Sequence, residues 1–258
     1  MIVDECHHIT APTFELVAKK CKGRYFLGLS ATVTRKDGHH PIIFMQLGPL
    51  RYRVTDKEQA TARPFTHEVI PRLTDFQIRH TTDEHPQIQQ IYTEMCDDNN
   101  RNVLITNDVC NAVEHGRSPL ILTERRDHVK QLSTLLTAQG CRVFILQGGT
   151  GRKKNALLMK ELSERKETDR AVIVATGRFI GEGFDDARLD TLFLAHPVSW
   201  RGTLAQYAGR LHRIHYAKNQ VIIYDYVDSN VPVLARMFER RKPGYRSIGY
   251  ELKASNPG

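Results

Sequence analysis

The sequence predicts an α/β fold in which a parallel sheet carries helices on both faces. The main observation is a regular alternation beyond Gly116, where short aliphatic runs take turns with segments whose apolar residues recur at helical spacing. The second is the composition: 40% hydrophobic and 26% charged residues over 258 positions are ordinary for a globular protein able to bury a core.

Five aliphatic runs mark the strands of this alternating part. They are Leu120–Leu122, Val143–Leu146, Ala171–Ala175, Leu192–Ala195 and Val221–Tyr224. The predicted helices between and after them are marked by Val129–Leu136, by Ala156–Leu162, and by residues 201–213 and 232–241. Gly140 suits the end of the first of these helices, and Pro243-Gly244 is expected to end the last.

The chain before Gly116 is less regular. We expect strands at residues 1–5, Tyr25–Leu29 and Arg51–Val54, and helices at 12–20, 86–96 and 101–114, whereas the apolar segment Pro41–Met45 fits either type. Residues 55–64 are polar, which indicates a linker. The sequence thus predicts one part at residues 1–54 and a second at 65–258.

Charge and cysteine content narrow the class of protein. The net charge is +8 and the pI is about 9.3, which favours a polyanionic partner such as nucleic acid, although a protein can also be basic without one. The five cysteines are odd in number and widely spread, which predicts a reduced, cytoplasmic protein without a disulfide framework. No run of about 18 apolar residues is present to span a membrane.

Three polar residues stand out in the helix predicted at 201–213. Gln206, Arg210 and Arg213 are four and three residues apart, so on a helix they project from one face. One amide and two guanidinium groups on a single face suit a polyanion such as a triphosphate. The pattern Gln-x-x-Gly-Arg-x-x-Arg resembles the sixth motif of superfamily 2 helicases and translocases. In that family these residues bind ATP, and the two arginines are catalytic because they stabilise charge on the γ-phosphate.

The segment before that helix resembles the fifth motif of the same family. It reads Ala-Thr-Gly at 175–177 and Gly-Glu-Gly-Phe-Asp at 181–185. The resemblance implies that Thr176 and Gly177 contact the nucleic-acid strand, while Gly183 and Asp185 face the nucleotide. Arg210 and Arg213 have a plain alternative role, which is to pair with the acids at 185 and 186.

The opening strand ends in two acids, Asp4 and Glu5, at the sheet edge where open α/β folds bind ligands. Asp-Glu-Cys-His at 4–7 resembles the second motif of the family, the DEAD/DEAH-type box. The resemblance implies that Asp4 holds Mg²⁺, that the catalytic Glu5 orients the attacking water, and that His7 links the box to the sixth motif. A solvated strand end is the plain alternative.

Ser-Ala-Thr at 30–32 resembles the third motif, in which Ser30 and Thr32 would couple ATP hydrolysis to movement. The surrounding GLSATVTRKDGHH stretch is similar to the branch that contains repair helicases and restriction-type motor subunits. The RNA-dedicated DEAD-box branch differs, because it has Ala-Asp where this chain has Cys6-His7. The resemblance therefore favours DNA over RNA as substrate.

Two further stretches are candidates for nucleic-acid contact. Thr123 and Arg125 follow a strand in a segment that resembles the fourth motif, and hydroxyl and basic groups at such a place suit phosphates. Gly148 and Gly149 open a helix, where free backbone amides receive phosphate. The alternatives are a solvated helix start for the first stretch and a simple glycine turn for the second.

The resemblance covers the second to sixth motifs but not the phosphate-binding loop, since Gly-x-x-x-x-Gly-Lys-[Ser/Thr] occurs nowhere in the chain. We therefore expect residues 1–54 to be the tail half of a first RecA-like domain and 65–258 to be a complete second one. The chain is interpreted as the C-terminal portion of an ATP- and Mg²⁺-dependent helicase, inactive alone, whose partners are nucleic acid and the missing N-terminal RecA-like segment. The alternatives are a motor fragment of a restriction or defence complex and a non-catalytic nucleic-acid-binding module.

Overall fold

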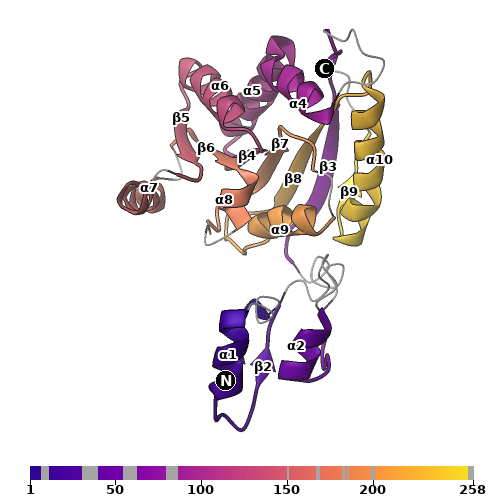
Figure 1. Ribbon diagram of the computed structural model, residues 1–258. Coiled ribbons are helices and arrows are strands. Elements are labelled where there is room, and N and C mark those ends of the chain that lie inside the picture. Colours follow the sequence, from indigo (N-terminus) through magenta and orange to yellow (C-terminus); the bar gives the residue numbers. More distant parts are fainter. Residues whose placement is uncertain are drawn as a thin grey trace. The chain divides into compact units, whose positions relative to one another are not determined.

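The computed structural model describes residues 1–6, 12–30, 40–54, 63–79, 87–149, 151–166, 169–181, 184, 186–198 and 201–254. The chain folds into two compact units, residues 1–55 and 56–258, drawn together in Figure 1. The predicted linker falls almost wholly outside the described residues.

The first unit is a small α/β element with two strands and two helices. Its elements are β1 (Ile2–Val3), α1 (Pro12–Lys20), β2 (Leu27–Gly28) and α2 (His40–Leu47). The strands pair in parallel, with Ile2 opposite Leu27. The apolar segment at Pro41–Met45 is helical, whereas the strand predicted at Arg51–Val54 is wrong: these four residues are exposed and extend no ladder among the described residues.

The second unit is built on one seven-stranded sheet. Its strands are β3 (Thr66–Leu73), β4 (Pro119–Thr123), β5 (Arg142–Leu146), β6 (Ala171–Thr176), β7 (Thr191–Leu194), β8 (Gln220–Val227) and β9 (Glu251–Leu252). They lie in the order β5-β6-β4-β7-β8-β3-β9, and every pair is parallel. The predicted parallel α/β fold is confirmed.

Helices cover this sheet on both sides (Figure 1). They are α4 (Ile88–Asp97), α5 (Asn99–Glu114), α6 (Arg126–Ala138), α7 (Arg152–Glu164), α8 (Gly177–Gly181), α9 (Arg201–Leu211) and α10 (Pro232–Ser247). Among the described residues, no helix is both long enough and apolar enough to cross a bilayer.

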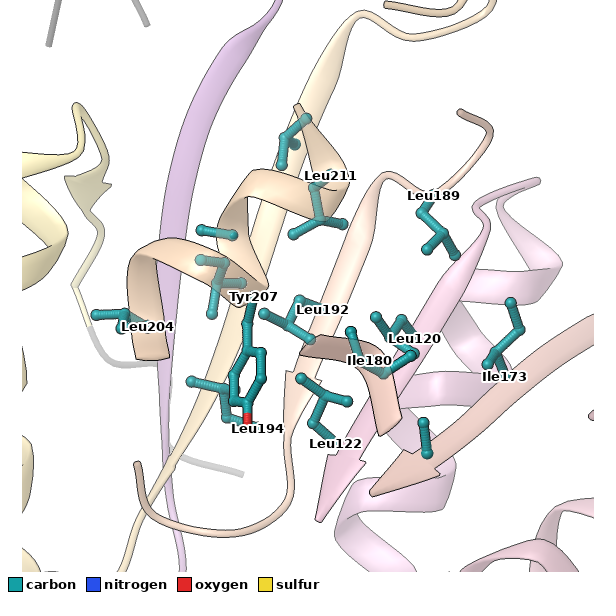
Figure 2. Packing of buried hydrophobic residues seen from close by; sticks show 14 of the residues in the cluster. Leu120, Leu122, Ile173, Ile180, Leu189, Leu192, Leu194, Leu204, Tyr207 and Leu211 are labelled. Carbon is teal, nitrogen blue, oxygen red and sulfur yellow. The ribbon is translucent and has the colours of Figure 1, made fainter. Parts of the chain in front are cut away.

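Side chains of β4 show how one strand serves both faces. Leu120 and Leu122 point to the layer of α8 and α9, where they belong to one buried cluster with Ile180, Tyr207 and Leu211 (Figure 2). Ile121 points the other way, into the layer of α5 and α6. Because successive strand residues face opposite sides, a strand that is apolar throughout buries both faces. All five residues of β4 are buried, as this requires.

A buried ion pair ties three strand ends to the start of α5. Arg101 is 2% exposed, and its guanidinium donates to the carboxylate of Asp228 at 2.8 Å and to the carbonyl oxygen of Ala195 at 2.8 Å. Asp228 also accepts the hydroxyl of Thr74, just beyond β3. The helix itself begins at a side-chain cap, since Asp98 accepts the amide of Arg101 at 2.8 Å.

Two predicted helix ends are wrong. The helix expected at 201–213 ends at Leu211, so Arg213 lies beyond its last turn. The helix expected to stop before Pro243 continues through it to Ser247. Tertiary contacts explain the continuation, because Tyr245 is fully buried and donates its hydroxyl to Asp225 at 2.7 Å. Burial of this side chain offsets the hydrogen bond that proline removes.

Replacing Arg101 with alanine tests the buried ion pair. The change leaves the Asp228 carboxylate buried without its cation, so we expect it to lower the free energy of unfolding by about 3–5 kcal/mol. Arg142→Ala is the matched control, because Arg142 is 46% exposed and pairs with Glu161 at the surface; its cost should stay below about 1 kcal/mol. Urea unfolding measures both, and equal costs would contradict this assignment.

Candidate functional site

The carboxyl edge of the large sheet brings together the six residues that were predicted to contact nucleic acid. Thr123 and Thr176 are register partners at the ends of β4 and β6, and Leu146 at the end of β5 is paired with Ala175. The residues that follow these strands therefore leave the sheet side by side. The set comprises Thr123, Arg125, Gly148, Gly149, Thr176 and Gly177.

These six residues differ in how far their side chains or backbone are exposed to a ligand. Gly148 and Gly149 are exposed and Arg125 is half-buried, whereas Thr123 is only 1% exposed and Thr176 is 9% exposed. Backbone amides and guanidinium groups are thus the accessible donors at this edge, and the two threonines mainly shape the strand ends.

The hydroxyl of Thr123 is held by a buried relay of side chains. His128 contacts it through Nδ1 at 2.9 Å and contacts the Asn102 side-chain oxygen through Nε2 at 2.8 Å. An amide oxygen only accepts, so Nε2 carries the proton and the threonine hydroxyl donates to Nδ1. Burial lowers the pKa of His128 well below its ordinary value, and the cation of Arg101 acts in the same direction, so the ring stays neutral. The relay fixes the end of β4.

Gly177 occupies a place where no side chain fits. A Cβ atom there would collide with the hydroxyl of Tyr207 and the carboxylate of Glu124, and would stand 2.8 Å from Tyr207 Cζ. Tyr207 reaches this point from α9 and donates its hydroxyl to Glu124 at 3.2 Å; Figure 2 shows its ring beside Leu194, the last residue of β7. The contact ties the helix with the sixth-motif pattern to the ends of β4 and β6.

Neither Tyr207 nor Glu124 was singled out by the sequence analysis, because each lies inside a motif-like stretch without matching a motif position. Desolvation raises the pKa of Glu124 above the usual glutamate value, while the hydrogen bond from Tyr207 acts in the opposite direction. Burial also raises the pKa of Tyr207, so the phenol remains a donor.

Two arginines stand beside the glycine turn and an adjoining cavity. Gly149 has φ +88°, which favours glycine, and the guanidinium of Arg126 would lie 3.4 Å from a Cβ atom there. A cavity of about 630 Å³ opens next to Arg125 and Arg126. Its lining is Gln89, Tyr92, Glu124, Arg125, Arg126, Asp127, His196 and Pro197. Cations next to exposed backbone amides form a place that suits phosphate.

The polar residues of the sixth-motif pattern are only partly brought onto one helix face. Gln206 and Arg210 lie one turn apart on α9, exposed and half-buried respectively, whereas Arg213 is exposed beyond the helix end. The plain alternative paired these arginines with Asp185 and Asp186, of which only Asp186 is described. That carboxylate instead binds Arg165 at 3.0 Å and Arg188 at 2.8 Å. Gly183 and Asp185 lie outside the described residues.

A buried lysine caps the C-terminal end of α9. Lys218 is 4% exposed, and its ammonium donates to the carbonyl oxygens of Leu211 and Arg213, both at 2.8 Å. A cation at this place satisfies carbonyls that the helix leaves unpaired and opposes the negative end of its dipole. Burial lowers the pKa of Lys218 from 10.5 to about 8, against the attraction of Asp190 and Asp186. The backbone of Arg213 is thereby held although the helix has ended.

In the first unit, the acids and the hydroxyl of the second and third motifs share one edge. Asp4 and Glu5 follow β1, and Ser30 lies two residues beyond β2. The two segments are joined because Leu29 donates its amide to Val3 and Cys6 donates to Leu29, both at 2.9 Å. His7 and Thr32 lie outside the described residues.

Asp4 places one exposed carboxylate just beyond β1. Asp4 is exposed, and its carboxylate accepts the amide of Glu5 at 2.9 Å, while Glu5 adopts a left-handed φ of +48° that presents it at the strand end. Magnesium at phosphoryl-transfer sites is held by one or two carboxylates together with water and phosphate oxygens. A single exposed carboxylate at a strand end fits that ligand set.

Comparison with known proteins places this chain and its fold in a class. The model of the helicase conserved C-terminal domain matches residues 86–215, and that of the type III restriction enzyme res subunit matches residues 1–35. The structure of Saccharomyces cerevisiae Dbp5 bound to RNA and ADP BeF3 superposes with a TM-score of 0.63 at 13% identity, over 99% of this chain and 59% of that one. The predicted RecA-like fold is confirmed by this likeness.

Two relatives extend over the whole chain. "Putative ATP-dependent RNA helicase L396" of Acanthamoeba polyphaga mimivirus is 25% identical over 98% of this chain and 48% of its own length. "Probable helicase D10" of Escherichia phage T5 is 24% identical over 100% of this chain and 55% of its own length. The chain spans about half the length of these relatives. The protein belongs to the superfamily 2 helicases and carries their conserved C-terminal domain.

Alanine at position 177 tests the contact between α9 and the sheet edge. Overpacking against Tyr207 and Glu124 should lower the free energy of unfolding by about 1–3 kcal/mol. Gly209→Ala, inside α9 with no described atom within 4 Å of its Cβ position, should instead stabilise the chain by about 0.5–1 kcal/mol. In a Tyr207→Ala background the Gly177→Ala cost should shrink, and an unchanged cost in denaturant unfolding would refute the contact.

Stability should depend on pH through Lys218. The folded chain releases this proton near pH 8, whereas the unfolded chain keeps it to about 10.5, so between these values the unfolded state binds more protons and stability rises with pH. The slope from this group is at most about 1.4 kcal/mol per pH unit. Urea unfolding from pH 7 to 10 should show the rise in the wild type and lack it in Lys218→Met. Parallel curves for the two proteins would contradict the assignment.

Proposed function

We propose that this chain is the C-terminal portion of an ATP-driven helicase or translocase that moves along nucleic acid. The observation that carries the proposal is the carboxyl edge of β4, β5 and β6, where the guanidinium of Arg126 lies beside Gly148 and Gly149 and where Arg125 and Arg126 line a cavity. Backbone amides and guanidinium groups along one edge suit the phosphates of a strand, and this contact carries no sequence preference.

The proposed role in nucleotide binding rests on the three polar residues of the sixth-motif pattern. Gln206 and Arg210 on α9, with Arg213 beyond it, would approach the γ-phosphate of ATP bound against a first RecA-like domain, where the arginines would stabilise the charge of phosphoryl transfer. Gly183 and Asp185 would approach the same nucleotide. ATP with Mg²⁺ at Asp4 would supply the energy, and Glu5 would orient the attacking water.

The first unit supports the idea of a larger domain. It exposes apolar side chains on its short strand and helix, with Ile2 at 70%, Phe14 at 57% and Val17 at 63%. Large apolar side chains exposed on so small a unit leave surface that further protein can cover. We therefore propose that residues 1–54 complete a RecA-like domain together with an N-terminal segment that supplies the phosphate-binding loop, and that Ser30 and Thr32 couple the two domains.

The contacts of Tyr207 at the sheet edge support a proposed mechanism of movement along the strand. Tyr207 ties α9 to Glu124 and the Gly177 position, so a movement of α9 toward or away from ATP would be transmitted to the ends of β4 and β6. Thr123, Thr176 and Gly177 lie at those ends, and their backbone positions set where the strand is held. Closing and opening of the two domains around ATP would then advance the protein along one strand in the cytoplasm.

We propose DNA as the substrate, because Cys6-His7 and the stretch after Gly28 resemble the repair and restriction branch. RNA is the second candidate, since the name of the mimivirus relative gives RNA as its substrate. The match of residues 1–35 to a restriction subunit supports a restriction or defence motor as a further alternative.

Binding of a single-stranded oligonucleotide tests the proposed edge. We expect salt-sensitive binding by the chain without nucleotide, and Arg125→Ala should weaken it by about tenfold and reduce the salt slope by about one. Arg142→Ala is the matched control, because Arg142 opens β5 at the opposite edge of the sheet and should change affinity little. Equal losses for the two variants would refute the edge assignment.

The same titration separates the candidate functions. Tighter binding of DNA than of RNA of the same sequence supports the DNA assignment, and the reverse order supports RNA. Because the sequence contains no phosphate-binding loop, we expect this chain alone to show no nucleic-acid-stimulated ATP hydrolysis. Stimulated hydrolysis by the chain would refute that expectation, whereas hydrolysis restored by a longer chain that carries the loop would exclude the non-catalytic module.

A further inference from the structure

Two cysteines from different elements lie in contact on the side of the sheet covered by α5 and α6. Cys110 is in α5, and Cys141 immediately precedes β5; their sulfur atoms are 3.6 Å apart. The other three cysteines are Cys6, Cys21 and Cys96. All five are described, and no other pair of them is in contact in this part of the structure.

Hydrogen bonds orient the two thiols. Cys110 donates to the side-chain oxygen of Gln139 at 2.7 Å, and the amide nitrogen of Gln139 donates to Asn107 at 3.3 Å, which fixes the direction of that amide. Because the Cys110 proton is used in this way, Cys141 is the donor in the sulfur–sulfur contact. The sulfur of Cys110 therefore presents a lone pair toward Cys141.

The turn that carries Cys141 is fixed by its backbone. Gly140 has φ +80° and ends α6, and the amide of Cys141 donates to the carbonyl of Leu136 at 3.0 Å. Cys110 lies within the regular part of α5. Cys110 is held in a helix and Cys141 in a hydrogen-bonded turn, and their sulfur atoms must approach from 3.6 Å to the roughly 2.05 Å of a disulfide.

Access differs between the two sulfur atoms. Cys110 is half-buried, whereas Cys141 is 5% exposed. Burial, together with the contact with Cys141, raises the pKa of Cys110 to about 12. A raised pKa leaves little thiolate at neutral pH, so oxidation of Cys110 is slow there and becomes faster as the pH rises. Cys110 is the sulfur that a small oxidant reaches, and Cys141 is placed to resolve the product.

We propose that Cys110 and Cys141 form a reversible oxidation site for peroxide, independent of nucleic acid and nucleotide. The Cys110 thiolate attacks hydrogen peroxide: a sulfur–oxygen bond forms, the oxygen–oxygen bond breaks, and hydroxide leaves as water. Cys141 then attacks the sulfenic sulfur, a sulfur–sulfur bond forms, and the second oxygen leaves as water. Two thiols are oxidised and one peroxide is reduced to two waters.

The cross-link would join α5 to the start of β5, which is an edge strand of the large sheet. Its ends are 31 residues apart, and the closed loop contains β4, α6 and the segment from Thr123 to Arg125. Closing a loop of this length restricts the unfolded chain, so the oxidised protein should melt roughly 5–10 °C higher than the reduced one. A reducing thiol should return both the melting temperature and the free sulfhydryl groups.

The experiment treats the full chain with hydrogen peroxide, digests it without reduction and identifies cross-linked peptides by mass. We expect a Cys110–Cys141 peptide that a reducing thiol removes. Cys141→Ser should abolish it and leave Cys110 as a sulfenic acid trapped by dimedone, whereas Cys21→Ser, at the other half-buried cysteine, should leave the cross-link intact.

Other outcomes overturn the proposal. The first is oxidation of Cys110 without any Cys110–Cys141 peptide. The second is a cross-link that joins other cysteines at a similar yield. The third is an equal rate of Cys110 over-oxidation in the wild type and in Cys141→Ser. Cys141→Ala provides a second variant if the serine form fails to fold. Thermal melting of each oxidised protein then shows whether the bond closes within the native fold.

Discussion

Parallel hydrogen bonding throughout the large sheet is the constraint on which the rest of this structure depends. Seven strands run in one direction, so every strand ends at the same edge and every following loop begins there. Residues more than fifty positions apart, such as Thr123 and Thr176, become direct neighbours through this register alone. The edge proposed to contact nucleic acid is therefore a consequence of strand direction, and the helices cover the two faces of the sheet.

Polar groups buried near the strand ends make that edge rigid. The relay from Thr123 through His128 to Asn102 holds β4, and the pair of Arg101 and Asp228 holds the ends of β7 and β8. Such groups are costly to bury unless each one finds a partner, so they favour one arrangement of the strands over its neighbours. The exposed donors beside them, at Arg125 and the glycine turn, can then bind a ligand without first being ordered.

The helix α9 is fixed by contacts at two points, one of them at this edge. Tyr207 fastens its middle to Glu124 and Gly177, and Lys218 fastens its end through the carbonyls of Leu211 and Arg213. Gln206 and Arg210 thus belong to a helix anchored at two points, and Arg213 follows its end. A helix held at two points can transmit a displacement from one site to another as a rigid element.

Sequence alone determined the alternation of strands and helices, the parallel sheet and the place of each motif after a strand, because these follow from local apolar spacing and chain order. It could not decide that α9 ends at Leu211 or that α10 runs through Pro243, since burial of Tyr245 outweighs the local preference. Nor could it find Tyr207 with Glu124, or Cys110 with Cys141. Those pairs join elements far apart in the chain, and only the packed sheet brings their atoms within reach.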